Sequence, residues 1–315
     1  MIEYRSFRND DPPRLADVWR AADLGPAGFQ PMTAAWLESC VFSKPYFDRE
    51  GLVVALDGER MLGFAHAGFG PNPEHTAIST ITGTTMLVVV VPHDHQEEIG
   101  AALLARCEEY LFRRGAATIM GGGTPALGGF YLGLYGGASL PGILDSSPLM
   151  QGVFRRAGYL EADRIAVMRR PLAGFRPPVG RVQLAIRRST QMRVIDEPAR
   201  RDWWEAATTT GISLRRYELR DEAAAPLGAA TFWDVEPLAT SWGFAAAGLF
   251  GVTVEGPRRR QGLASHLIAE ALHDLAQEGV ALCETHVSEA NEAAIKLFFK
   301  LGFEATAHGT LFRKP

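Results

Sequence analysis

The fold of this chain is decided by the stretch Val252-Thr253-Val254-Glu255-Gly256-Pro257-Arg258-Arg259-Arg260-Gln261-Gly262-Leu263-Ala264. A β-branched run stops at Gly256-Pro257, a basic turn follows, and apolar residues then recur at helical spacing from Leu263 to Leu275. A helix start offers unpaired N–H groups and the positive end of the helix dipole, and a glycine there lets the backbone approach an anion. The stretch therefore predicts a strand, a turn and a helix N-terminus that bind a diphosphate.

Two motifs in this region resemble those of the GCN5-related N-acetyltransferase (GNAT) superfamily. Arg259, Gly262 and Ala264 form the pattern Arg-x-x-Gly-x-Ala, which resembles the superfamily's acyl-CoA pyrophosphate loop. Taken alone, so short a pattern is more often a solvated basic turn. Val287 and the segment Asn291–Phe303, however, resemble the second signature, Val-x-x-x-Asn-x-x-Ala-x-x-Leu-Tyr-x-x-x-Gly-Phe. Because the two motifs occur in the right order, about one helix and one strand apart, the chain is identified as a member of the superfamily.

The resemblance implies an α/β fold with a mixed sheet, built as two tandem GNAT (acyl-CoA N-acyltransferase) domains. A length of 315 residues is enough for two domains with a core each. We expect an N-terminal GNAT-like domain over residues 1–172, a Pro- and Gly-containing linker over 173–181, and a C-terminal GNAT domain that binds acyl-CoA over 182–315.

The composition describes a globular protein, with 47% hydrophobic and 22% charged residues. A net charge of −4 gives no general field that would attract nucleic acid. The N-terminus lacks the pattern of a signal peptide, and no apolar run approaches the roughly 18 residues of a membrane span. We therefore expect a cytoplasmic protein with no membrane or nucleic-acid partner. The three cysteines lack metal-ligand spacing, so neither a metal site nor a disulfide framework is expected.

The first half departs from the family pattern at its own cofactor loop. Val90-Val91-Pro92 matches the family's strand end, which places the loop at 93–100, but His95 replaces the leading basic residue and Glu98 stands where the turn glycine should be. A carboxylate about 4 Å from a phosphate charge opposes binding by on the order of 1 kcal/mol in water and about 4 kcal/mol at an effective dielectric constant of 20. We expect this half not to bind CoA in the usual way, and acids at a helix start suit its dipole without any ligand.

Other elements follow from apolar periodicity and turn residues. The sequence predicts helices over 13–24, 32–42, 99–113 and 198–208, and strands over 52–56, 61–69, 85–91, 165–168, 182–186, 213–219, 227–233 and 250–254. Residues 148–159 resemble the second signature, with Ser147 at the position of its asparagine. Residues 303–312 are expected to close the sheet as a last hairpin. The Gly- and aromatic-rich segment 121–142 predicts an ordered loop, either a wall of the acceptor pocket or a structural cover.

The resemblance also implies the residues that bind the acyl-CoA. Val252, Thr253 and Val254 lie on the strand that pairs with the pantetheine arm, and a backbone N–H near Val252 or Thr253 would polarise the thioester carbonyl. Residues for the pyrophosphate, the other phosphates and the pantetheine arm are Arg259, Arg260, Gln261, Gly262, Leu263, Ala264, Ser265, Asn291 and Lys296, with Arg258 as a further cation. Asn291 also suits a helix N-cap. Phe298 stands where many relatives have a tyrosine that protonates the leaving thiolate, so that proton must come from water or another group, such as Tyr217.

His286 is the candidate general base. In several GNAT enzymes an acid occupies this position, before the strand-ending valine, and an imidazole can take a proton at neutral pH from an ammonium acceptor. Glu284 shares its strand face and is the second candidate, although a structural role is common for a lone histidine. Cys283 lies on the other face.

The interpretation is an N-acetyltransferase that moves an acetyl or acyl group from acetyl-CoA directly to a primary amine of a small molecule or peptide. One alternative is a non-enzymatic, regulatory acyl-CoA-binding protein, because the tyrosine is missing and the first loop is degenerate. Another is an aminoacyl transferase that uses charged tRNA, which would need a broad basic surface. The acceptor, the acyl-chain preference and the oligomeric state stay open.

Overall fold

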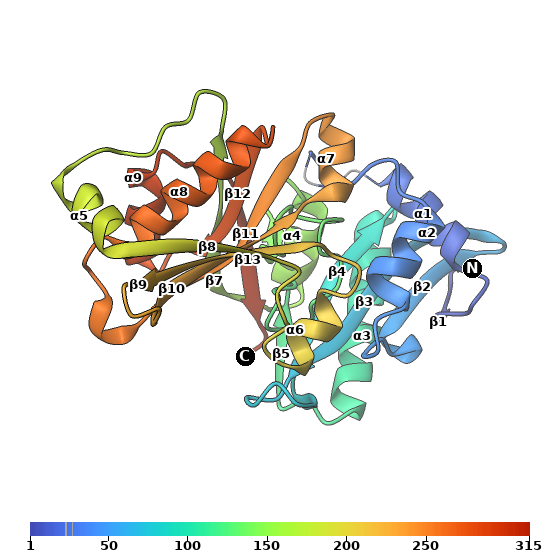
Figure 1. Cartoon of the computed structure of the whole chain (residues 1–315). Coiled ribbons are helices and arrows are strands. Elements are labelled where there is room, and N and C mark those ends of the chain that lie inside the picture. The colour runs from blue at the N-terminus through green and yellow to red at the C-terminus, as the bar shows by residue number, and fades with distance from the viewer. Residues whose placement is uncertain (23, 27) are drawn as a thin grey trace.

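The computed structural model describes residues 1–22, 24–26 and 28–315, with the side chain of residue 238 left out, and it consists of one continuous sheet with helices on both faces (Figure 1). Thirteen strands are described, and twelve of them lie in the order β1-β2-β3-β4-β5-β13-β7-β12-β11-β10-β9-β8, while β6 pairs with β13. The sheet thus runs without a break from the first half of the chain into the second.

The first half has the order helices, hairpin, strand and helix that the sequence predicts. Its strands are β1 (Glu3–Ser6), β2 (Leu52–Asp57), β3 (Arg60–Pro71), β4 (Ile78–Val90), β5 (Thr118–Gly121), β6 (Ile143–Leu144) and β7 (Leu160–Pro171). Its helices are α1 (Pro12–Ala21), α2 (Ala34–Leu37), the π-helical η1 (Glu38–Phe42), the 3-10 turn η2 (Arg49–Gly51), α3 (Gln96–Arg113) and α4 (Pro148–Arg156). The predicted hairpin forms around Gly58, whose φ of +59° is a conformation that glycine adopts without strain.

The second half repeats this order around its own hairpin. Its strands are β8 (Thr190–Asp196), β9 (Leu214–Asp221), β10 (Pro226–Asp234), β11 (Ala246–Val254), β12 (Leu282–Ser288) and β13 (Glu304–Arg313). Its helices are α5 (Arg181–Ser189), α6 (Trp203–Thr208), α7 (Glu236–Trp242), the 3-10 turn η3 (Gly256–Arg258), α8 (Leu263–Gln277) and α9 (Glu292–Lys300). None of the helices that the structure describes is long and apolar enough to cross a membrane.

Two predictions about this half are wrong. Residues 182–186 were expected to form a strand, but they lie in helix α5, where Val182 and Ile186, four residues apart, both face Gly262. Residues 303–312 do not form a closing hairpin. Residues 304–313 form the single strand β13, which pairs with strands β5 and β7 of the first half.

The last strand of each half lies beside strands of the other half. Strand β13 pairs with β5 and β7, and β7 pairs with β13 on one side and β12 on the other. Because side chains alternate along a strand, β7 can serve two cores: Val167 belongs to the hydrophobic core of the first half, and Ala166 and Met168 belong to that of the second. Phe312 of β13 is fully buried in the first core, stacked on Phe154. Each core therefore needs a strand from the other half.

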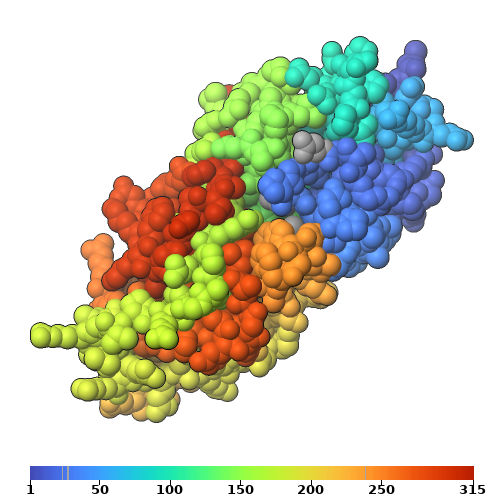
Figure 2. All heavy atoms as spheres, turned by 90° about the horizontal axis from the view of Figure 1, so that it is seen from above, coloured from blue at the N-terminus to red at the C-terminus, as the bar shows by residue number. Residues whose placement is uncertain are grey.

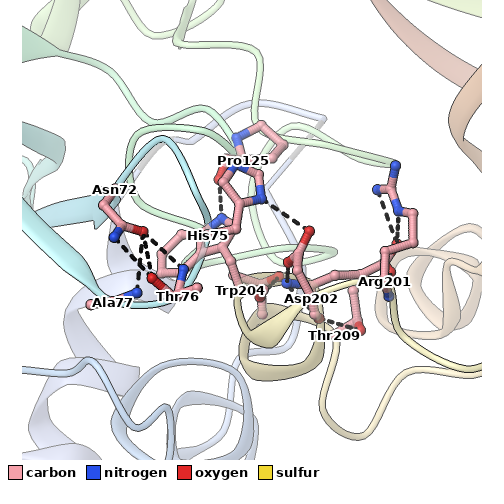
Figure 3. A network of polar contacts seen from close by, with 11 residues as sticks. Asn72, His75, Thr76, Ala77, Pro125, Arg201, Asp202, Trp204 and Thr209 are labelled. Carbon is pink, nitrogen blue, oxygen red and sulfur yellow. Dashed lines mark hydrogen bonds and ion pairs between the residues drawn. The ribbon is translucent and has the colours of Figure 1, made fainter.

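Helices of the second half also dock on the first half. Figure 2 shows an elongated molecule in which α7, in orange, lies against the blue N-terminal helices, and Gln30 N–H donates to Ser241 Oγ of α7 at 3.2 Å. Figure 3 shows the contacts of α6: His75, in the turn between β3 and β4, lies 3.1 Å from the carboxylate of Asp202, and Trp204 Nε1–H donates to Pro125 O at 3.1 Å. These contacts hold the two halves in one arrangement.

Candidate acyl-CoA site

A cleft opens where strands β11 and β12 separate. The two strands pair in parallel only over Ala246–Gly248 and Leu282–Glu284. Beyond these pairs they part and leave a hollow of about 820 Å³. Its walls come from residues 249–254 of β11, the basic turn, the start of α8, the end of β12 and one side of α9.

The edge of β11 that faces the cleft carries backbone donors. Glu255 N–H donates to Leu227 O of β10 at 3.0 Å. In an antiparallel ladder successive residues point their N–H groups to opposite edges, so Val252 and Val254 point theirs into the cleft while Thr253 points its N–H toward β10. Of the two residues proposed to polarise a thioester carbonyl, the alternation favours Val252.

The start of α8 supplies a second set of donors. Gly262 caps the helix with φ +85°, a left-handed conformation that glycine adopts without strain. The first helical hydrogen bond runs from His266 N–H to Gly262 O, so the N–H groups of Leu263, Ala264 and Ser265 precede it and point out of the helix end. Together with Arg258, Arg259 and Arg260, which also line the cleft, these N–H groups make this part of it suited to a negatively charged group.

Most of the predicted binding residues meet at this cleft. The lining includes Val252, Thr253, Val254, Arg259, Arg260, Gly262, Leu263, Ala264, Ser265, His286, Asn291 and Phe298. Gln261 and Lys296 are not part of it. Gln261 Nε2 donates to Pro257 O at 3.2 Å, and the side chain of Lys296 is 76% exposed and paired with Glu292. The sequence analysis missed Lys300, which lines the cleft one helical turn beyond Lys296.

Two residues of the second signature have structural roles here. The side chain of Asn291 caps α9 by accepting a hydrogen bond from Ala294 N–H at 3.1 Å. Phe298 is buried with its ring against Phe303. Tyr217 does not replace the missing tyrosine, because its hydroxyl donates to Asp274 of α8 at 2.8 Å and it lies in the core rather than in the cleft. Burial raises the pKa of Tyr217.

His286, which lines the cleft, forms a hydrogen-bonded pair with Glu284, which is buried behind it and is not part of the lining. His286 Nε2 lies 3.1 Å from Glu284 Oε1, and both side chains are almost fully buried. His286 Nδ1 is buried and has no hydrogen-bond partner among the described residues. With Nε2–H donating to the carboxylate, Nδ1 carries the lone pair and can accept a proton.

Glu284 itself is engaged on both oxygens. Its Oε1 accepts from Ala138 N–H at 2.6 Å, and its Oε2 accepts from Arg169 Nε at 2.6 Å. Burial raises the pKa of Glu284, but the hydrogen bond and charge of His286, the charge of Arg169 and the N–H of Ala138 outweigh it and lower the pKa below 4.5. This geometry favours a role for Glu284 as an ionised residue that orients His286. It is less suited to a role as a second general base.

Cys283 lies on the opposite face of β12, as strand alternation predicts. The thiol is fully buried in the second core, and burial raises its pKa. It is placed neither to reach His286 nor to carry an acyl group.

The corresponding space in the first half is filled with side chains. Strands β4 and β11 each have a bulge, at Met86 and at Phe250, and counting from the bulge makes Val88 the counterpart of Val252. Val88 N–H contacts Met150 Sδ of α4 at 3.5 Å, and every residue from Met86 to Val90 is buried. Glu97 at the start of α3 is paired with Arg156 of α4 at 3.4 Å. The N–H of Val88, the counterpart of the Val252 donor, is therefore covered by Met150.

Comparisons with known proteins agree with this architecture. Residues 184–303 match the model of the acetyltransferase (GNAT) family. The whole chain is similar in structure to a tandem GNAT protein from the clavulanic acid biosynthesis pathway, with 15% identity, 99% of this chain and 98% of that chain covered, and a TM-score of 0.67. It is also similar to a GNAT protein from Sphaerobacter thermophilus, with 16% identity, coverage of 99% and 95%, and a TM-score of 0.66.

A third similar structure is part of a larger enzyme. It is described as a GCN5-related glucosamine N-acetyltransferase region in a fungal multi-domain GH3 β-N-acetylglucosaminidase, with 17% identity and a TM-score of 0.73. The match covers 99% of this chain and 38% of that chain. A search of curated proteins gave no match.

Proposed function

We propose that this chain, whose residues 184–303 form a GNAT-family domain and which as a whole has the tandem GNAT fold, transfers an acetyl group from acetyl-CoA directly to a primary amine. The family and the fold support a general N-acetyltransferase function. The observation that carries the finer proposal is that His286 lines a cleft that also offers the Val252 N–H and the start of α8, and that its buried Nδ1 has no hydrogen-bond partner among the described residues.

Acetyl-CoA would supply the thioester, and the chain's own groups would do the rest. The helix start at Gly262 and the neighbouring arginines would hold the diphosphate, while the edge of β11 would hold the pantetheine arm. Val252 N–H would stabilise the negative charge that develops on the carbonyl oxygen. His286 Nδ1 would take a proton from the ammonium form of the acceptor, directly or through one water molecule.

Among the described residues that line the cleft there is no tyrosine, and Phe298, which is one of them, cannot donate a proton to the leaving thiolate. A thiol has a reference pKa of about 8.5, so a thiolate can leave near neutral pH with water as the proton source. This feature also motivates the second candidate function, a non-enzymatic acyl-CoA-binding protein.

The proposal is tested by measuring CoA release from acetyl-CoA with a panel of primary amines. His286→Ala should reduce kcat by roughly 10² to 10⁴-fold, the usual contribution of a general base, and leave the Kd for CoA unchanged. A wild-type rate in this variant would remove the base assignment. Stabilisation by acetyl-CoA against heat without CoA release for any amine would instead favour the non-enzymatic function.

A further inference from the structure

The carboxylate of Glu284 is held from both halves of the chain. His286 is on the same strand, whereas Ala138 and Arg169 come from the first half. Among the described residues, Arg169 and His286 are the charged or titratable side chains bonded to this carboxylate. Glu284 is fully buried, so its position is fixed by these partners rather than by solvent.

The pairing of β7, the last strand of the first half, with β12 of the second half brings Arg169 to Glu284. We call this arrangement of β7 and β13 the strand exchange. In the antiparallel pairing of β7 with β12, Arg169 lies directly opposite Glu284. Its guanidinium also lies 4.7 Å from the ring centroid of Trp242 of α7, an arrangement that orients the planar group.

The Gly137–Ala138 peptide also lies in close contact with the carboxylate of Glu284. Gly137 has φ +103°, and a Cβ added to it would lie 1.9 Å from Glu284 Oε1. On the other side, Trp233 Nε1–H donates to Ala138 O at 2.9 Å. Glycine is therefore required at 137 both for the backbone conformation and for the approach of the carboxylate.

These contacts have a chemical consequence for His286. A carboxylate that already accepts from Arg169 and Ala138 stays ionised and fixed in direction. It can then accept from His286 Nε2–H, which leaves Nδ1 as the basic nitrogen. A free carboxylate could rotate or take up the proton itself, and the imidazole would lose its defined orientation.

We propose that Arg169 and the Gly137–Ala138 peptide of the first half are positioning groups for the candidate base His286 and act through Glu284. This inference rests on the proposed function. It gives the segment 121–142 a role in the site, and it makes the first half, whose own CoA space is filled, a required part of the active site in the second half.

The test uses Arg169→Met and Gly137→Ala in the full chain. Arg170→Met is the matched control for the first, because Arg170 is the next residue of β7 and donates instead to Gly302 O at 2.9 Å. Gly243→Ala is the control for the second, because Gly243 has φ +77° and an added Cβ would meet nothing within 4 Å. Both test variants should lose about 10- to 100-fold in kcat, the size typical of losing a group that orients a functional ligand, with the Kd for CoA within twofold of wild type.

A pH profile separates positioning from loose folding. Arg169 lowers the pKa of Glu284, so in Arg169→Met the carboxylate should take up a proton at higher pH and the acidic limb of kcat should move upward. Arg169→Lys, which keeps the charge, should return the limb toward its wild-type position. Unchanged kcat and an unchanged limb in Arg169→Met would overturn the inference, and so would equal losses in Arg170→Met.

A second readout does not depend on catalysis. In proton NMR, the His286 Nε2–H should give a downfield resonance protected from exchange with water, assigned by its loss in His286→Gln. It should disappear or exchange rapidly in Arg169→Met and Gly137→Ala but persist in both controls. If the wild-type protein acetylates no amine, the proposed function fails while this resonance still decides the inference, and a resonance that persists in both test variants refutes it.

Discussion

Replacing Gly262 by glutamate tests the assignment of the diphosphate site, because it puts a carboxylate at the N-cap of α8. The first half does not have a glutamate at this point, contrary to the sequence-based expectation: the N-cap of α3 is His95, and Glu98 lies in the first turn of the helix. The new carboxylate would lie about 4 Å from a phosphate charge, which costs on the order of 1 kcal/mol in water and about 4 kcal/mol at an effective dielectric constant of 20. Since each 1.4 kcal/mol is a factor of ten, the Kd for CoA should rise roughly 5- to 1,000-fold, and the loss should shrink at high salt.

Gly262→Glu also lowers the stability of the fold, and this effect must be separated from its effect on the Kd for CoA. A side chain at φ +85° costs about 1–2 kcal/mol, and its Cβ would lie 3.2 Å from Val182 Cγ1 of α5. Gly279→Glu, at the other end of α8 with φ +90° and no atom within 4 Å of an added Cβ, has the backbone cost alone. Gly262→Ala measures the effect of the added Cβ on CoA binding without an added charge.

Binding is measured by titration calorimetry with CoA, and folding by thermal unfolding of the free proteins. All three variants should unfold at lower temperature than wild type, but only the two at position 262 should bind CoA more weakly, and the glutamate variant the more so. Wild-type affinity in folded Gly262→Glu, or an equal loss in Gly279→Glu, would show that the diphosphate does not sit at this helix start.

Three more predictions concern the rest of the molecule. Met150→Ala, which opens the filled space of the first half, should cost roughly 2–5 kcal/mol of stability, yet equilibrium dialysis should still give one CoA per chain; a second bound CoA would contradict the asymmetry. Phe312→Ala should cost about 3–5 kcal/mol and speed amide exchange in β5 of the first half, and exchange that is faster only in the second half would argue against the strand exchange. The pKa of Glu284 is lowered in the folded protein, so its contribution to stability is present above pH 4.5 and is lost as the pH falls. The urea midpoint of wild type should therefore drop more steeply below pH 4.5 than that of Glu284→Gln, and parallel curves would refute it.

The cleft could be predicted because its parts are local in sequence. The strand end, the turn and Gly262 lie within one short stretch, and their hydrogen-bonding needs follow from backbone geometry alone. The alternation that puts His286 and Glu284 on one face is equally local, and the structure confirms that they share a face.

The parts that could not be predicted depend on contacts between distant residues. Periodicity identifies β7 and β13 as strands but does not say which strand each one pairs with. Glu284 and Arg169 are 115 positions apart, so the local sequence around neither residue predicts their ion pair. Val182, Leu184 and Ile186 fit a strand by alternation, whereas Val182 and Ile186 fit a helix by their spacing of four, and the contact of both with Gly262 belongs to the helix.

The exchange of β7 and β13 also sets an order of events during synthesis. Strand β5 emerges from the ribosome with the first half, but its neighbour in the finished sheet, β13, is not made until residues 304–313 have been translated. Until then the edge of β5 lacks its native partner, and such an edge can pair with other chains. The sheet of the N-terminal half therefore cannot be completed before β13 has been synthesised. A newly made chain is most prone to aggregation in that interval.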